Sequence, residues 1–306
     1  MRLAALLRAG HSQKECAEQI GVSAGTISRE LAKNGGMKGY KALDAENRKK
    51  DRRGEANARF AKIRTKGWLI SCIIRNLKNH RSPEQIAGAL KRSRGETVSH
   101  ESIYIWIYTY RPDLKKYLRQ KKGKYRRRGG TKKREKTREE GKKRRINTRP
   151  AIVEKRSRIG DWEGDTIVGR GQSGRILTYV ERKSGYLVAA LIESGSPSLV
   201  LKTTAASFRG IPKKKRRTLT LDNGIEFSAY ELIERTTDMI IYFAFPYHSW
   251  ERGTNENTNG LLREYFPKKM SFAQLTQHNI DIAVKELNDR PRKRLGYQTP
   301  REVFGA

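Results

Sequence analysis

Two stretches decide how the second half of the chain folds: Asp161-Trp162-Glu163-Gly164-Asp165-Thr166-Ile167-Val168 and Thr218-Leu219-Thr220-Leu221-Asp222-Asn223-Gly224. Both are rich in β-branched, aromatic and aliphatic residues and end at a turn signal, so each predicts a β-strand. Asp165 lies inside the first strand. Asp222 is the residue at which the second strand stops.

The sequence around these stretches supplies the other elements of an α/β domain. Lys183-Ser184-Gly185 predicts a hairpin turn between two further strands. The expected strands are 161–168, 175–181, 186–191, 218–221 and 239–245, and the expected helices are 194–208, 227–236 and 254–266. The order of three strands, helix, strand, helix, strand, helix is that of the ribonuclease-H-like fold.

Three carboxylates lie on three different elements of this predicted order. Asp165 and Asp222 lie on two strands, and Glu256 lies in the first turn of the last helix. Carboxylates that converge from three elements form a cage for Mg²⁺, with Mn²⁺ as the alternative ion. Two such ions can promote in-line phosphoryl transfer. The competing interpretation is that each carboxylate serves a turn or a helix N-terminus.

The first 39 residues have the pattern of a helix-turn-helix. Ser12 and Ser23 are placed to cap two helices that are separated by a break at Gly21. The positions expected to face inward are Cys16, Ala17, Ile20, Ile27 and Leu31. The second helix then exposes Thr26, Ser28 and Arg29, which we expect to contact DNA. A plain helical hairpin is the alternative.

A second helical unit runs from Ser82 to Tyr110. Ser82 followed by Pro83 predicts a helix start, and Ser99 opens another helix. The positions expected to face inward are Ile86, Ala87, Leu90, Ile103, Trp106, Ile107 and Tyr110, and those expected to be exposed, and to contact DNA, are His100, Ser102 and Tyr104. The alternative is a helical packing or dimer module.

The charge of the chain points to a polyanionic partner. The 306 residues include 67 Lys and Arg against 32 Asp and Glu, a net charge of +35. Residues 1–150 carry +28 of it, and residues 115–149 hold 19 basic and 3 acidic residues. Such a segment predicts a basic linker that lies on phosphates. A membrane partner is disfavoured because the longest apolar run, 239–245, is too short to span a bilayer.

These signals divide the chain into five parts. Residues 1–39 form a helix-turn-helix, 40–67 a polar helical linker, 68–114 a second helix-turn-helix-like module, 115–150 the basic linker and 151–306 the catalytic domain. The predicted fold class is therefore multidomain, with all-α modules before an α/β ribonuclease-H-like domain. Two distant cysteines, Cys16 and Cys72, favour a reducing cytoplasm.

Several blocks resemble a known family. Trp162–Asp165, Thr220–Gly224 and Tyr247–Asn257 resemble the three blocks of DDE transposases and retroviral-type integrases, and 33 residues separate Asp222 from Glu256, as is typical of the bacterial insertion sequence 30 family. The stretches 26–31, 250–257 and 287–297 resemble other blocks of that family. The chain departs from the pattern at its start, where members usually carry more of the first helix ahead of Leu3. A shortened start and a truncated copy are the two interpretations.

The resemblance implies a function. Asp165, Asp222 and Glu256 would be the catalytic and metal-binding residues of a Mg²⁺-dependent transposase. It would bind the terminal inverted repeats of its own element, cut there and join the ends to target DNA. A homo-oligomer on DNA, in the bacterial cytoplasm at the nucleoid, is implied as well. The rivals are a DNA-binding repressor or inactive copy that keeps the fold, and a metal-dependent nuclease without strand transfer.

Overall fold

The computed structural model describes residues 2–119, 143–245, 251 and 253–306, with the backbone alone for residues 55–61. It divides into two compact units, one made of residues 1–73 and 98–112 and the other of residues 74–97 and 113–306. Within these ranges, no helix combines the length and the apolarity needed to cross a bilayer.

The first unit begins with the predicted helix-turn-helix. Helices α1 (Arg2–Arg8), α2 (Gln13–Ile20) and α3 (Ala24–Lys33) follow one another. Ser12 and Ser23 cap α2 and α3, and Gly21 has a left-handed φ of 78° that ends α2. The predicted inward residues Cys16, Ala17, Ile27 and Leu31 are buried together with Leu3, and Ile20 packs against this cluster. The prediction of this motif is confirmed.

The rest of the first unit is also helical. It contains α4 (Gly36–Gly39), α5 (Ala42–Thr65), the first part of α6 (Gly67–Lys78), and α8 (His100–Tyr110). Ile103, Trp106 and Ile107 are buried as predicted. The inward placement of Tyr110 is wrong, because 47% of this residue is exposed at the last turn of α8. Arg64 covers its ring, with the guanidinium carbon 4.9 Å from the ring centroid.

The second unit is built on a mixed five-stranded sheet. Its strands are β1 (Asp161–Val168), β2 (Arg175–Glu181), β3 (Leu187–Ile192), β4 (Thr218–Leu221) and β5 (Ile240–Phe243). The spatial order is β3-β2-β1-β4-β5, with β2 antiparallel to both neighbours and β1, β4 and β5 parallel. This is the arrangement of the ribonuclease-H-like fold, so the predicted fold class is confirmed.

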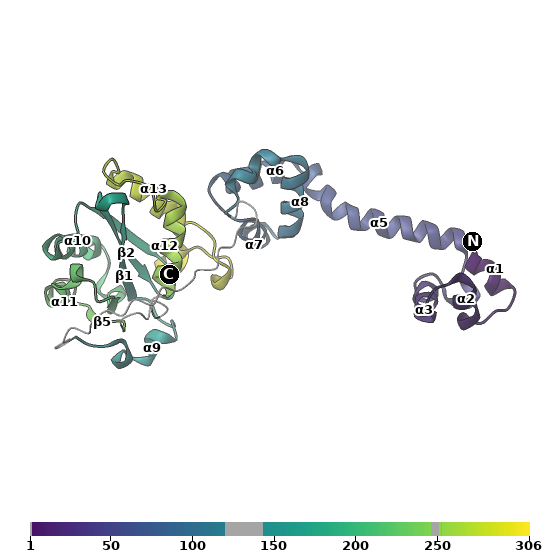
Figure 1. Cartoon of the computed structure of the whole chain (residues 1–306), viewed down its shortest axis with the longest axis horizontal. Coiled ribbons are helices and arrows are strands. Elements are labelled where there is room, and N and C mark those ends of the chain that lie inside the picture. Colours follow the sequence, from purple (N-terminus) through teal and green to yellow (C-terminus); the bar gives the residue numbers. More distant parts are fainter. Residues whose placement is uncertain (1, 120–142, 246–250, 252) are drawn as a thin grey trace. The chain divides into compact units, whose positions relative to one another are not determined.

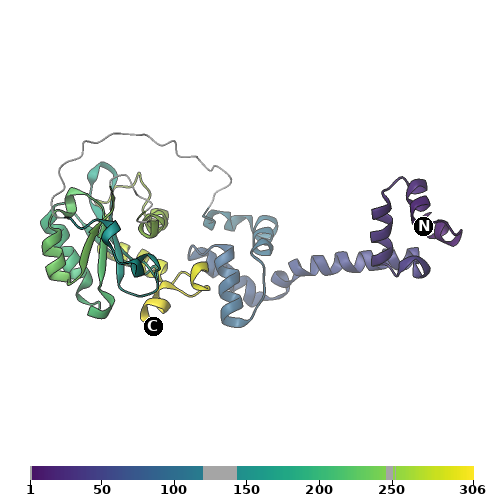
Figure 2. The same cartoon turned by 90° about the horizontal axis from the view of Figure 1, so that it is seen from below.

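Helices cover both faces of this sheet. The helices are α9 (Ala151–Glu154), α10 (Pro197–Arg209), α11 (Tyr230–Thr237), α12 (Gly253–Tyr265), α13 (Gln277–Asn288) and α14 (Pro300–Gly305). Figures 1 and 2 show α10 and α11 on one side of the sheet and α12 and α13 on the other. Because successive side chains of a strand point to opposite faces, the sheet separates two hydrophobic cores. One core surrounds Trp162 and Leu221, and the other surrounds Ile167 and Leu262.

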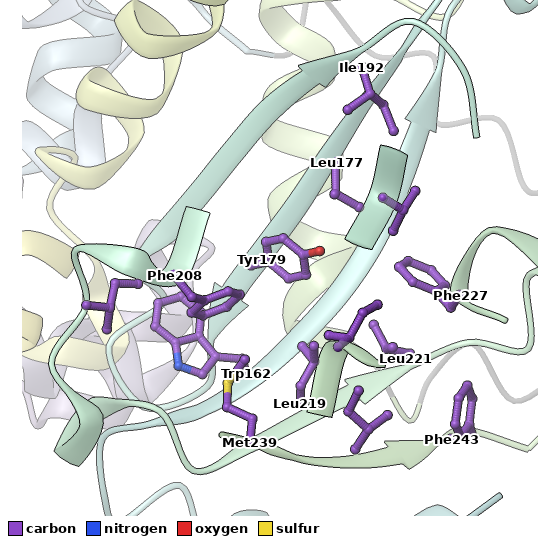
Figure 3. Close-up of a cluster of buried hydrophobic side chains, with 14 residues drawn as sticks. Trp162, Leu177, Tyr179, Ile192, Phe208, Leu219, Leu221, Phe227, Met239 and Phe243 are labelled. Atoms are coloured by element: carbon purple, nitrogen blue, oxygen red, sulfur yellow. The ribbon is translucent and has the colours of Figure 1, made fainter. Parts of the chain in front are cut away.

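Gly164 marks the tightest approach in the first core, which is drawn in Figure 3. A Cβ atom at this position would lie 2.5 Å from Cδ2 of Leu221 and 3.1 Å from the ring of Tyr179. Glycine is the residue that fits, because a real Cβ does not approach a neighbour this closely. The close packing fixes β1 against β4, and with it the relative position of Asp165 and Asp222.

Helix α7 (Pro83–Arg94) belongs to the second unit and packs on its C-terminal segment. Arg92 forms a two-fold contact with the carboxylate of Glu302, at 3.0 and 3.1 Å. Gly88 lies against Tyr297, so closely that a Cβ would meet the ring at 2.3 Å. This packing ties the start of the second predicted helical module to the end of the chain.

Candidate active site

Alternation along β1 and β4 brings acidic and hydroxyl side chains to one face of the sheet. Trp162, Leu219 and Leu221 pack into the core under α10 and α11. The intervening residues of both strands therefore face α12, since successive side chains of a strand point to opposite sides. On β1 these are Asp161, Glu163 and Asp165, and on β4 they are Thr218 and Thr220, followed by Asp222.

Asp165 lies in the middle of β1, and Asp222 directly follows β4. Glu163 pairs with Thr220 at the end of the β1–β4 register, so each aspartate lies two residues beyond that last pair. Both are half-buried. Oδ2 of Asp165 accepts from the side-chain amide of Asn259 at 2.8 Å, and Oδ1 of Asp222 accepts from the backbone N–H of Gly224 at 3.0 Å. The fixed carboxylates thus face partly toward solvent.

Glu256 lies on the first turn of α12, on the surface of the helix. The helix is anchored to β1 on both sides of it. The backbone N–H of Asn255 donates to Oε2 of Glu163 at 2.9 Å, and Asn259 donates to Asp165. Among the residues described, no three His, Cys, Asp or Glu side chains lie close enough together to hold a metal ion. The described structure therefore does not bring Asp165, Asp222 and Glu256 together as a metal site with three carboxylates.

The neighbouring carboxylates have structural partners. Asp161 accepts from Arg158 at 2.9 and 3.0 Å, and Glu163 is fully buried against Arg182 at 2.8 Å. Glu226 accepts from the hydroxyl of Thr166 at 2.9 Å, and Glu251 accepts from the backbone N–H of Phe245 at 2.9 Å. These contacts give a structural role to the acidic residues near the site that are not among the three predicted catalytic carboxylates.

Two supporting features were not predicted from the sequence. The first is Asn259, whose amide holds Asp165. The second is a chain of charges in which the buried Arg182 contacts Glu163 and the exposed Glu154. The buried Arg149 contacts the same Glu154 and the hydroxyl of Thr220. Burial, with the nearby charge of Arg182, lowers the pKa of Arg149 to about 10. The spacing of Asn259, three residues after Glu256 on the same helix, was the available signal.

The predicted DNA-contacting residues of the first helix-turn-helix are exposed. Thr26, Ser28 and Arg29 all lie on the surface of α3. The hydroxyl of Thr26 lies 2.9 Å from that of Ser23, and Nε of Arg29 donates to the backbone oxygen of Gly25 at 3.0 Å. Contact with DNA by these residues stays a prediction.

The second set of predicted contacts requires a correction. His100 and Tyr104 are half-buried, and the expected exposure of Ser102 is wrong, because only 7% of it is exposed. Its hydroxyl lies 2.9 Å from that of Ser99, and its backbone N–H is capped by the same group. Ser102 is turned inward because it completes the start of α8.

The basic segment is described at its two ends, and residues 120–142 lie outside the described residues. At the near end, Arg119 pairs with Glu264 at 2.8 Å. At the far end, Arg144 pairs with Glu234, and Arg149 is 7% exposed and bonded to Thr220 at 2.7 Å. The expectation that the whole segment lies on phosphates is therefore wrong for Arg149, because its guanidinium is enclosed by the catalytic domain.

Comparison with known proteins agrees with this architecture. The chain is 39% identical to the transposase for insertion sequence element IS4351 of Bacteroides fragilis, over 98% of this chain and 91% of that protein. It is 35% identical to transposase InsI for insertion sequence element IS30A of Escherichia coli (strain K12), over 97% and 81%. The chain belongs to the insertion sequence 30 family of transposases.

A third transposase and two solved structures also resemble parts of this chain. The transposase for insertion sequence element IS1086 of Cupriavidus metallidurans is 33% identical over 96% of this transposase and 88% of its own length. Comparison with protein-family models finds no match. Among solved structures, a chain of the simian T-cell lymphotropic virus intasome in complex with PP2A regulatory subunit B56 gamma shares 17% identity, with a TM-score of 0.42 over 48% of this chain and 54% of its own. The catalytic core domain of BIV integrase shares 20%, with a TM-score of 0.38 over 47% and 91%.

The three blocks that resemble those of DDE transposases, 162–165, 220–224 and 247–257, all fall in the second unit. The first two are described in full. In the third, residues 247–250 and 252 lie outside the described residues, whereas Glu251 and residues 253–257 lie within them. The residues that carry the catalytic prediction are therefore all described.

Proposed function

We propose that this transposase cuts DNA at the terminal inverted repeats of its element and joins the freed ends to target DNA. Asp165, Asp222 and Glu256 are the residues to which we assign the chemistry. The proposal is supported by the parallel pairing of β1 with β4, because Asp165 and Asp222 each lie two residues beyond the last pair of that register, and by the place of Glu256 in the first turn of α12.

The donor set suits a hard divalent cation. Carboxylate oxygens are the ligands that Mg²⁺ and Mn²⁺ prefer, and Asp165 and Asp222 offer them at a partly solvent-exposed edge. Asn259 fixes the orientation of Asp165, as a second layer of hydrogen bonds does for metal-binding carboxylates. Two bound ions would activate the attacking oxygen and stabilise the leaving oxygen.

The proposed reaction consists of two displacements at phosphorus. In the first, water attacks the phosphodiester at the element end, the P–O3′ bond breaks and a 3′-hydroxyl leaves. In the second, this hydroxyl attacks a target phosphodiester, forms a new P–O bond and releases the target's own 3′-hydroxyl. Each step forms one bond and breaks one, so no covalent bond to the protein is required.

The helical part of the chain would supply recognition. Thr26, Ser28 and Arg29 are exposed on a helix of the kind that enters the major groove. A homo-oligomer that pairs two element ends, acting at the nucleoid in the bacterial cytoplasm, completes the proposal.

One experiment separates the proposal from its rivals. Full-length protein is incubated with Mg²⁺, a duplex carrying one element end and a target plasmid. We expect nicking at the end and covalent joining to the plasmid. Binding without cleavage would favour the repressor, and cleavage without joining would favour the nuclease.

A further inference from the structure

A second polar pocket lies at the N-terminus of α12, away from the carboxylates. It has a volume of about 220 Å³, and Arg156, Thr254, Arg292 and Arg294 line it. Residues 254, 257 and 258 of α12 border the pocket, whereas Asn255 and Asn259 contact β1. At 100° per residue, Glu256 falls on the opposite flank of the helix from Thr254.

The pocket concentrates positive charge. Burial, together with the charges of Arg290 and Arg294, lowers the pKa of Arg292 to about 10. Burial and the charge of Arg156 likewise lower the pKa of Arg294. Within the described part of the chain, the nearby carboxylates pair with Arg290 and Arg301 and not with Arg156, Arg292 or Arg294. Arg292 and Arg294 each donate to a backbone oxygen, that of Leu287 or Lys183. Guanidinium groups gathered in this way are a ready site for an anion.

Thr254 gives an independent indication of a ligand. It is 8% exposed, and its hydroxyl has no hydrogen-bond partner among the described residues. Buried polar groups in native proteins almost always have a partner, so this hydroxyl is placed to receive one from the pocket. It lies beside the N-terminal amides of a 13-residue helix, where partial positive charge adds to that of the arginines.

The size of the pocket limits what the anion can be. Sites for drug-sized molecules occupy about 300–1,000 Å³, so a pocket of about 220 Å³ is too small for them. A phosphate group matches both the charge and the fork geometry of the arginines. An adjoining pocket of about 100 Å³ shares Asn257 and Arg292 and adds Arg119 and Arg290, so the basic surface extends beyond a single group.

We propose that this pocket binds one phosphate of the DNA backbone, formed by the C-terminal arginines Arg292 and Arg294 together with Arg156 and Thr254. The inference rests on the proposed function, because it takes DNA as the polyanion. The pocket lies on the flank of helix α12 away from Glu256. The pocket would hold the strand in register with the active site.

The test uses the full chain, a short duplex of arbitrary sequence and the salt dependence of binding. In the double variant Arg156→Gln/Arg294→Gln, Arg156 is exposed, whereas Arg294 gives up one hydrogen bond to the backbone oxygen of Lys183, so urea denaturation of the same preparation checks that the variant folds. The slope of log affinity against log salt should become shallower by about 0.9, the value for one lost phosphate contact. Lys293→Gln is the matched control, because it removes a charge between Arg292 and Arg294 in sequence but does not line the pocket. Its slope should equal that of the wild type.

Two further variants separate charge from geometry. Arg156→Lys/Arg294→Lys should keep the wild-type slope, because the positive charge remains. Thr254→Val should lower the affinity about tenfold at an unchanged slope, since it removes a hydrogen bond to a charged group but no charge. A wild-type slope in the double glutamine variant would overturn the proposal, as would an equal loss in Lys293→Gln.

Two additional measurements identify the source of the phosphate and separate this inference from the proposed function. Calorimetry with inorganic phosphate alone should give no binding stronger than that of the duplex. If free phosphate binds tightly and its addition leaves the affinity for the duplex unchanged, the assignment of the pocket to DNA is overturned. Cleavage by the wild type is assayed in parallel. If the wild type does not cleave DNA but the double glutamine variant still has a shallower salt slope, the proposed function is wrong and the phosphate pocket is supported.

Discussion

Strand β1 carries three carboxylates on one face, and they have different surroundings. Asp161 and Glu163 are 1% and 0% exposed, and each contacts a guanidinium group, that of Arg158 or Arg182. Asp165, two residues further along, is half-buried and accepts from the neutral amides of Asn259 and Thr166. The comparison shows that position along one strand separates carboxylates that build the fold from one that is available for chemistry.

The physical reason lies in how far the sheet face is covered. A buried carboxylate is strongly destabilising unless an opposite charge and hydrogen bonds compensate it, as at Glu163. Around Asp165 and Asp222 the cover is incomplete, so both side chains stay partly exposed. Two carboxylates brought close together would repel each other, and a divalent cation would relieve that repulsion.

The largest loss of cleavage activity is expected from changes at Asp165 and Asp222. Asp165→Asn and Asp222→Asn should each lower the rate of strand cleavage by about 10⁴-fold or more, because the carboxylates act as a unit. The free energy of unfolding should stay equal or rise, since each change removes a like-charge repulsion. Cleavage rates with Mg²⁺ and urea denaturation of the same preparations check both parts. A cleavage rate near that of the wild type in either variant contradicts the assignment.

The second prediction concerns Glu163, where we expect a loss of stability. Glu163→Gln should lower the free energy of unfolding by about 3 kcal/mol, because Arg182, itself 3% exposed, is left buried without its charged partner. Urea denaturation of this variant, with Asp165→Asn as the matched control, measures the difference. Equal stability of the two variants would remove the distinction between a structural and a chemical carboxylate.

The third prediction concerns the support of Asp165. Asn259→Ala should reduce cleavage by about 10–100-fold, because a second-layer partner orients the carboxylate without performing the reaction. The loss should shrink as the Mg²⁺ concentration is raised. A titration of cleavage rate against Mg²⁺ checks this, and a loss that is independent of Mg²⁺ would argue for a purely structural role.

A smaller effect, on DNA binding, is expected in the basic segment. There Arg149 is compared with the basic residues before it. Replacing several Lys and Arg residues in 121–138 with Gln should flatten the salt slope of DNA binding by about 0.9 per lost phosphate contact and weaken all sequences alike. Arg149→Gln should lower stability instead, since its guanidinium is bonded to Thr220. Binding isotherms at several salt concentrations, with one specific and one random duplex, check the pattern. Altered sequence preference at constant slope would mean that the segment reads bases.

The smallest effect is expected at Glu251. Its carboxylate accepts from the backbone of Phe245, so Glu251→Gln keeps an acceptor oxygen and should change cleavage only slightly. The cleavage assay used for Asp222→Asn measures it. A loss as large as that of Asp222→Asn would mean that Glu251 belongs to the reacting set.

Local signals made much of this fold predictable. Ser12, Ser23, Ser82 and Ser99 all cap helices where the sequence placed them, because a cap depends on residues within one turn. The five strands were predicted nearly to their bounds for the same reason. Ser102 was misplaced because helical spacing alone does not show that the capping serine will also bind its hydroxyl.

Long-range pairings were not predictable in this way. The contact of Arg149 with Thr220 spans 71 residues, and that of Asn259 with Asp165 spans 94. No local pattern distinguishes Arg149 from the other basic residues of its segment. The three carboxylates were predicted from their order along the elements and from the family blocks around them, and their catalytic role stays a prediction.

The claim that Asp165, Asp222 and Glu256 form one catalytic unit is tested most directly by comparing single and triple losses. The cleavage rate of an element-end duplex with Mg²⁺ is measured for Asp165→Asn, Asp222→Asn, Glu256→Gln and the triple variant, with DNA binding measured on the same preparations. We expect all four cleavage rates to fall to about the same low level, because the groups act together, and DNA binding to stay close to that of the wild type. Full cleavage activity in any single variant would contradict the account.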